Sequence, residues 1–107
     1  GKSITLVYDE FFVDWELVFG VGLPAHVVAQ RALGIEDAQE AKDALVEAVQ
    51  NADAAALAPI SSVWNSDWNF TELPAEEDAN LLVVNGPYTI TDFVADQSIT
   101  LTANENY

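Results

Sequence analysis

The stretch NGPYTITDFVADQSITLTANENY, residues 85–107, decides the fold of this sequence. Tyr88 and Ile90 alternate with Thr89 and Thr91 in a run that continues to Val94, and hydroxyl-bearing and apolar residues alternate again from 98 to 103, which is the period of a half-buried strand. Residues 95–97 separate the two runs, and Asn85-Gly86-Pro87 precedes them as a turn. The stretch therefore predicts an antiparallel β-hairpin with one polar and one apolar face, and the apolar face should lie on a core.

Amphipathic segments upstream predict the helices of that core. The first helix should begin at Leu23-Pro24 and end before Gly34, because proline suits a first turn and glycine a helix end. Asp37 should cap the second helix, with Glu40 three positions later as in a capping box. Its apolar stripe has spacings of three and four and consists of Ala38, Ala41, Leu45, Ala48, Val49 and Ala52.

A third helix should follow Asp53, a second capping residue, although Pro59 should kink this helix or delay its start. Residues 65–80 read as a surface loop, because asparagine, aspartate and proline are frequent there. Leu81–Val84 is a possible further strand.

The N-terminal part predicts one strand and one aromatic segment. In residues 3–8, SITLVY, Ile4, Leu6 and Tyr8 alternate with Thr5 and Val7. This alternation and the β-branched residues predict a strand. Residues 11–22 are rich in aromatic side chains and end in glycines, so we expect a short helical turn or an irregular segment, buried under a helix. Together the patterns predict a single small α+β domain with about three helices and a C-terminal hairpin.

Composition excludes several classes of function. The chain of 107 residues carries 18 Asp and Glu against 3 Lys and Arg, a net charge of −15. Such a charge repels phosphate backbones, so we expect no nucleic-acid partner and interpret the acid as a solvated surface. With no cysteine, disulfides, thiolate metal sites and cysteine nucleophiles are excluded.

Individual motifs give no catalytic constellation. His26, the sole histidine, has no serine close by on its face of the helix, and we expect it to be structural or solvent-facing. Gly20-Val21-Gly22 lacks the further residues of a phosphate-binding loop. We therefore predict no enzyme activity, catalytic residue or cofactor.

One spacing is typical of a calcium loop. Asn65, Asp67, Asn69 and Glu76 stand at positions 1, 3, 5 and 12 of that pattern, but Phe70 occupies the position that needs glycine. We interpret the stretch as a surface loop and assign no metal ligand, and whether it holds a cation stays open.

Four elements of the last third resemble a known family when read in order. They are Asn85-Gly86-Pro87-Tyr88-Thr89-Ile90, then Asp92-Phe93, then Asp96-Gln97-Ser98-Ile99-Thr100-Leu101, and Asn104-Glu105-Asn106-Tyr107. This order is similar to the G-P-Y, strand, turn, strand and N-x-x-Y segment of family 5 extracellular solute-binding proteins of ABC importers. In that family a tryptophan normally follows the tyrosine.

Weaker similarities extend upstream. Residues 4–8 with Phe12-Val13-Asp14-Trp15 resemble a strand and aromatic segment of the family, and Leu23-Pro24-Ala25-His26-Val27 resembles its L-P-x-H-V helix start. The long Ala/Glu helix and Trp64-Asn65 are similar to an insertion in actinobacterial members.

The resemblance implies a two-lobed periplasmic-binding-protein type II fold, of which residues 1–107 would be one segment of the first lobe. The parent would be a substrate-binding subunit that carries peptides or similar small solutes to a membrane permease. It would be extracytoplasmic, as a cell-surface lipoprotein or a periplasmic protein. Because a lobe segment should expose apolar surface that its neighbours cover, the isolated piece is expected to self-associate.

The resemblance also names two ligand-binding candidates, Asn104 and Tyr107, because the family's N-x-x-Y region approaches the ligand cleft. The competing interpretation is that Asn104 ends the strand and Tyr107 packs on the lobe. Two other classes remain open: an acidic protein-interaction domain without a ligand cleft, and a hydrolase segment that would need partners for His26.

Overall fold

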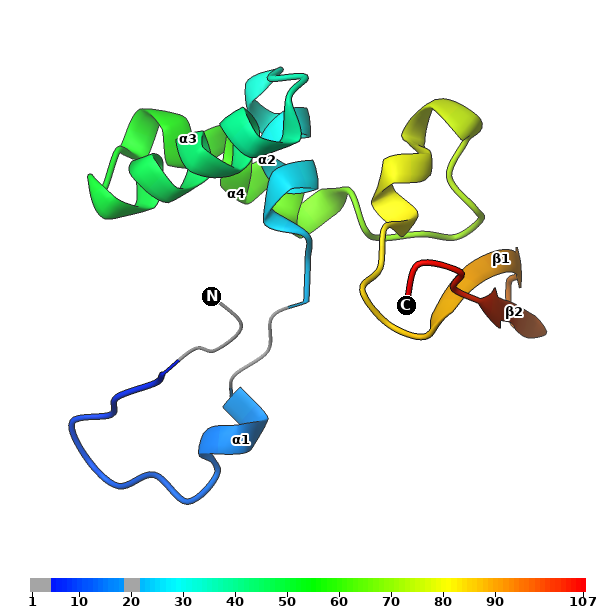
Figure 1. Ribbon diagram of the computed structural model, residues 1–107, viewed down its shortest axis with the longest axis horizontal. Helices are drawn as coiled ribbons and strands as arrows, with labels where there is room; N and C mark the ends of the chain where they lie inside the picture. The colour runs from blue at the N-terminus through cyan, green and yellow to red at the C-terminus, as the bar shows by residue number, and fades with distance from the viewer. Residues whose placement is uncertain (1–4, 19–21) are drawn as a thin grey trace.

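The computed structural model describes residues 5–18 and 22–107 of the chain. These residues form an α+β structure with a C-terminal antiparallel hairpin, as predicted (Figure 1). In chain order the elements are α1 (Trp15–Val18), α2 (Ala25–Leu33), α3 (Ala38–Gln50), α4 (Ala54–Ser66), a 3-10 helix η1 (Glu76–Leu82), β1 (Tyr88–Val94) and β2 (Ser98–Ala103). No helix in the described ranges is long and apolar enough to span a bilayer.

Helices α2, α3 and α4 pack together and hold the main core (Figure 1). Val28 of α2, Ala48 of α3 and Ile60 of α4 are its buried centre, at 0%, 5% and 7% exposure. Ala41, also on α3, is fully buried, and its small side chain allows neighbouring backbones to approach closely. Partly buried apolar side chains surround the centre: Leu23, Ala32, Leu33, Leu45, Ala56, Leu57, Val63 and Trp68.

The predicted helix ends are confirmed by their hydrogen bonds. The Asp37 carboxylate accepts from the backbone N–H groups of Gln39 at 2.9 Å and Glu40 at 2.8 Å. Asp53 caps α4 in the same way. Gly34 ends α2 in the left-handed region at φ 69°, which glycine adopts at little steric cost.

Pro59 does not delay α4, which begins at Ala54, directly after its cap. Of the two effects expected of Pro59, a kink or a delayed start, the delay does not occur, because the Asp53 cap satisfies two N–H groups of the first turn; the kink stays a prediction.

The predicted N-terminal strand is absent from residues 5–8, which have no regular secondary structure; Ser3 and Ile4 lie outside the described residues. The single sheet in the described ranges consists of β1 and β2, so this segment has no strand to pair with. A short helix, α1, does form within the aromatic segment, but its predicted burial is wrong for the part described. Phe11 is 92% exposed and Trp15 45%. Figure 1 shows this part of the chain apart from the helical core.

The predicted strand at Leu81–Val84 was also wrong. The predicted loop over residues 65–80 was wrong at both ends, where α4 extends to Ser66 and η1 begins at Glu76. Leu81 belongs to η1 and is 6% exposed. Its carbonyl accepts a hydrogen bond from the indole Nε1 of Trp68 at 3.0 Å, an interaction that anchors η1 near the end of α4.

The hairpin has the predicted strands and turn. Tyr88 pairs with Ala103 at one end and Val94 with Ser98 at the other, with an irregularity between Ile90 and Asp92. The apolar face is covered only in part. Ile90 and Phe93 of β1 are half-buried beside Trp68 and Leu82, around a shallow cavity of about 230 Å³. On β2, Ile99 and Leu101 remain 58% and 54% exposed.

Candidate functional site

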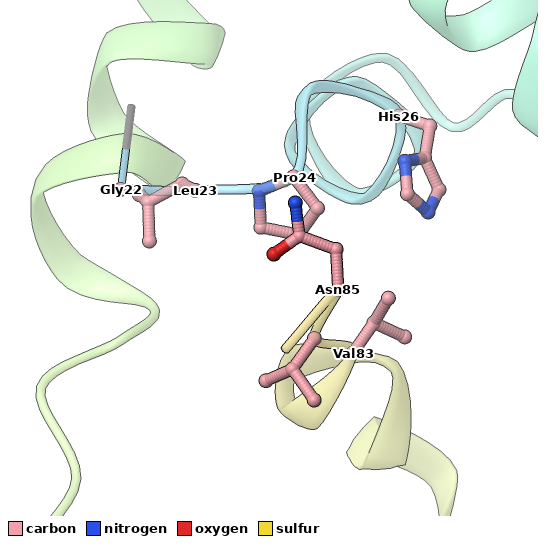
Figure 2. Close-up of a pocket in the computed structure, with 7 residues that line it drawn as sticks. Gly22, Leu23, Pro24, His26, Val83 and Asn85 are labelled. Atoms are coloured by element: carbon pink, nitrogen blue, oxygen red, sulfur yellow. The ribbon is translucent and has the colours of Figure 1, made fainter. Parts of the chain in front are cut away.

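A cavity of about 350 Å³ lies where the start of α2 meets the segment after η1. In Figure 2, His26 lies on α2, Leu23 and Pro24 lie just before it, and Val83 and Asn85 approach from the other side. The cavity thus joins two stretches that are about sixty positions apart in the chain. These are the two stretches in which the sequence resembles an L-P-x-H-V helix start and an N-G-P-Y turn.

The described lining of this cavity offers hydrogen-bonding groups and apolar surface. Among the described residues that line it, His26 and Asn85 are the ones with polar side chains. His26 is half-buried in the first turn of α2. The part of the lining that the structure describes contains neither a nucleophile nor a carboxylate that could orient His26 for acid–base catalysis.

Asn104, one of the two predicted ligand-binding residues, forms hydrogen bonds with other residues of this chain. Its Nδ2 donates to the carbonyl of Gly86 at 2.8 Å, and its backbone N–H donates to the carbonyl of Pro87 at 2.9 Å. Its Oδ1 accepts from the backbone N–H of Asn106 at 3.0 Å. Asn104 therefore closes the hairpin by tying the residue after β2 to the turn before β1. We call these three bonds the Asn104 clamp.

Tyr107 lies close to Asn104 through the backbone, since its N–H donates to the Asn104 carbonyl at 3.2 Å. Its side chain is 80% exposed. The expectation that Asn104 ends the strand is met, because β2 ends at Ala103. Tyr107 does not pack on the described part of this chain, and its packing on a complete lobe stays a prediction.

A cluster around Arg31 was not predicted. Its Nε donates to Asp67 Oδ2 and its Nη1 to Asp78 Oδ1, each at 2.6 Å, so α2 is tied to the end of α4 and to η1. The hydrogen bonds with Asp78 and Asp67 raise the pKa of the Arg31 guanidinium. The bonds that Asp67 accepts from Arg31 and Ser66 lower the pKa of its carboxyl group. Composition held a signal for this cluster, because a half-buried cation among so many carboxylates must be paired.

The calcium-like spacing does not form a ligand shell. Asn65 lies in the last turn of α4 with its amide donating to the Ser61 carbonyl, and Asn69 donates to the Asn65 carbonyl. Asp67 is paired with Arg31. Across the part of the chain that the structure describes, no three His, Cys, Asp or Glu side chains are grouped so that they could hold a metal ion.

Comparison with known proteins gives no further assignment. No family model, no curated protein and no solved structure matches this chain.

Proposed function

We propose that this chain is a non-catalytic segment of the first lobe of an extracytoplasmic solute-binding protein, whose complete form binds peptides or similar small solutes for an ABC importer. The proposal rests on the resemblance of residues 85–107 to that family. The observation that carries it is the Asn104 clamp, because the first and last elements of the motif are joined by direct hydrogen bonds.

The cavity beside α2 adds support. Two stretches with separate family similarities, around Pro24 and Asn85, meet there although they are distant in sequence. A chance resemblance in two unrelated stretches gives no reason for them to be neighbours in space.

The exposed apolar surface agrees with a segment that packs against other parts of a larger protein. Exposed large apolar side chains are most frequent in the N-terminal part, where Phe11 is 92% exposed, and in the hairpin, where Ile99 is 58% exposed. Many exposed apolar side chains are typical of a face that another part of a protein covers. In the complete protein, neighbouring lobe segments would cover it; without them, the chain would self-associate.

Within this proposal the two binding candidates have different roles. Asn104 uses both ends of its amide in the clamp, so it would position the turn. The ring of Tyr107 is exposed and would be the residue that contacts a solute in the complete cleft.

A second candidate is an acidic protein-interaction domain without a cleft. The observation that favours it is the combination of a net charge of −15 with an exposed aromatic segment before α2. Such a domain would dock on a basic, apolar partner.

The complete reading frame that encodes this chain separates the two candidates. A lipoprotein or secretion signal upstream and a tryptophan codon directly after Tyr107 are expected for the solute-binding protein. A natural stop codon after Tyr107 would overturn that proposal and leave the interaction domain.

A further inference from the structure

Within residues 5–18 and 22–107, no strand covers the outer edge of β2. This strand pairs with β1 on one side, the sheet has two strands, and all six residues of β2 are exposed. In Figure 1 the hairpin lies at one extremity of the molecule, away from the three-helix core. Proteins usually protect such edges with lysine, proline, inward-pointing charges or bulges on the edge strand. The sequence SITLTA contains neither a charge nor a proline, and the one irregularity of the hairpin lies on β1.

The residues of β2 form a symmetric pattern around Thr100. Moving outward, Ile99 and Leu101 are both apolar, and Ser98 and Thr102 both bear hydroxyl groups. We propose that β2 pairs with β2 of a second copy of this chain, antiparallel, about a twofold axis that passes between the two Thr100 residues.

This register makes the interface complementary to itself. Ile99 of each copy stands opposite Leu101 of the other, so apolar side chains that are more than half exposed in one chain cover each other. They extend the face on which Ile90 and Phe93 already lie, and the two hairpins become one four-stranded sheet. Four strands with one apolar face are more stable than an isolated hairpin.

Charge is compatible with the same register. Beyond the paired strands, Asp96 stands opposite Asn104, and Glu105 opposite Ala95, so no carboxylate faces another across the axis. The remaining repulsion comes from the net charge of −15 on each copy, which salt screens. Dimerisation therefore strengthens as ionic strength rises.

The area available limits the affinity. Stable specific interfaces bury about 1,200–2,000 Å² in total, and one pair of six-residue strands provides less. We therefore expect a weak dimer with a Kd of about 0.1–1 mM, which sedimentation equilibrium can measure.

The test measures the mass of the 107-residue chain by sedimentation equilibrium up to about 1 mM, in NaCl at about 0.05 M and about 0.5 M. We expect a reversible dimer that is tighter at the higher salt concentration. A monomer under all of these conditions would overturn the proposal. A chain that stays monomeric but binds an added cationic extended peptide, most strongly at low salt, would also overturn it.

Matched variants test the twofold axis itself. Thr100→Lys and Thr100→Glu each place like charges opposite one another, and each should weaken the dimer about twofold to fivefold. An equimolar mixture of the two variants should restore association, because the charges are then complementary. Thr91→Lys, the same change at an exposed position of β1, is the control and should leave the dimer constant unchanged.

The circular dichroism spectrum of each variant serves as the control for retained helices. Dimers that persist in both Thr100 variants, or a mixture that stays monomeric, would exclude pairing at Thr100. Dimers that persist in both Thr100 variants are the result expected if the chain associates through the aromatic segment before α2. The proposed function expects self-association through any exposed apolar surface, whereas the Thr100 variants and their mixture test pairing through β2 alone.

Discussion

Replacing Asn104 should open the hairpin while leaving the helical core intact. The Asn104→Ala variant loses the partly buried bond to the Gly86 carbonyl at 2.8 Å and the exposed bond from the Asn106 N–H at 3.0 Å. A hydrogen bond between neutral groups contributes about 1 kcal/mol, and the exposed one less, so the expected loss is about 1–1.5 kcal/mol. Because the hairpin makes few contacts with the core, the loss should be local to it.

Amide hydrogen exchange measured by NMR detects this local change. A loss of about 1–1.5 kcal/mol corresponds to protection that is about fivefold to tenfold lower at the amides of β1 and β2, with α2, α3 and α4 unchanged. Asn104→Asp keeps the acceptor for Asn106 but cannot donate to Gly86, so it should lose most of the same protection.

Asn106→Ala is the matched control, because Asn106 contributes its backbone N–H to the clamp and alanine keeps that group. If Asn104→Ala leaves the amide exchange protection of β1 and β2 unchanged, the role of the clamp is refuted. A loss that is equal in the hairpin and in the helices would refute its local character.

Three further predictions concern the helical part. The bond from Arg31 lowers the pKa of Asp67 below its usual 3.8, so the stabilisation it gives is complete above pH 3.8 and is lost as the pH falls through the lowered value. Arg31→Gln should therefore cost about 1–2 kcal/mol in urea unfolding at pH 7 and much less below the folded pKa; an equal cost at both would contradict the pairing. Ile60→Ala should cost about 2–4 kcal/mol in the same assay, whereas Val49→Ala, at a site 58% exposed, should cost under about 0.5 kcal/mol. Asp53→Ala should cost about 1 kcal/mol and Asp53→Ser much less, and thermal melts that do not distinguish the two would argue against the cap.

Local signals in the sequence predicted the helix ends and the hairpin correctly. Asp37, Asp53 and Gly34 act within one turn of their own position, so their effect depends little on the rest of the fold. Alternation on both sides of residues 95–97 likewise specifies a pairing between neighbours in the chain.

Predictions that depended on distant partners failed. Residues 5–8 have a strand-like composition, but a strand exists only where another strand pairs with it. Burial of Phe11 and Trp15 was inferred from their apolar side chains, although burial requires a surface to pack on. Leu81 was assigned to a strand because a short apolar run does not distinguish a strand from a buried helical turn.

The candidate site could be predicted only in part. Asn104 was singled out through a family resemblance, and the structure shows its amide engaged in closing the hairpin. The Arg31 cluster joins positions 36 and 47 residues apart, and no local pattern connects them.

Solute binding by the complete gene product tests the proposed function most directly. Native mass spectrometry of that protein, mixed with a library of short peptides, should show one peptide or similar small solute bound per molecule, and Tyr107→Ala should weaken that binding while Asn106→Ala should not. A complete, folded gene product that binds no peptide or other small solute would contradict the assignment to a solute-binding protein.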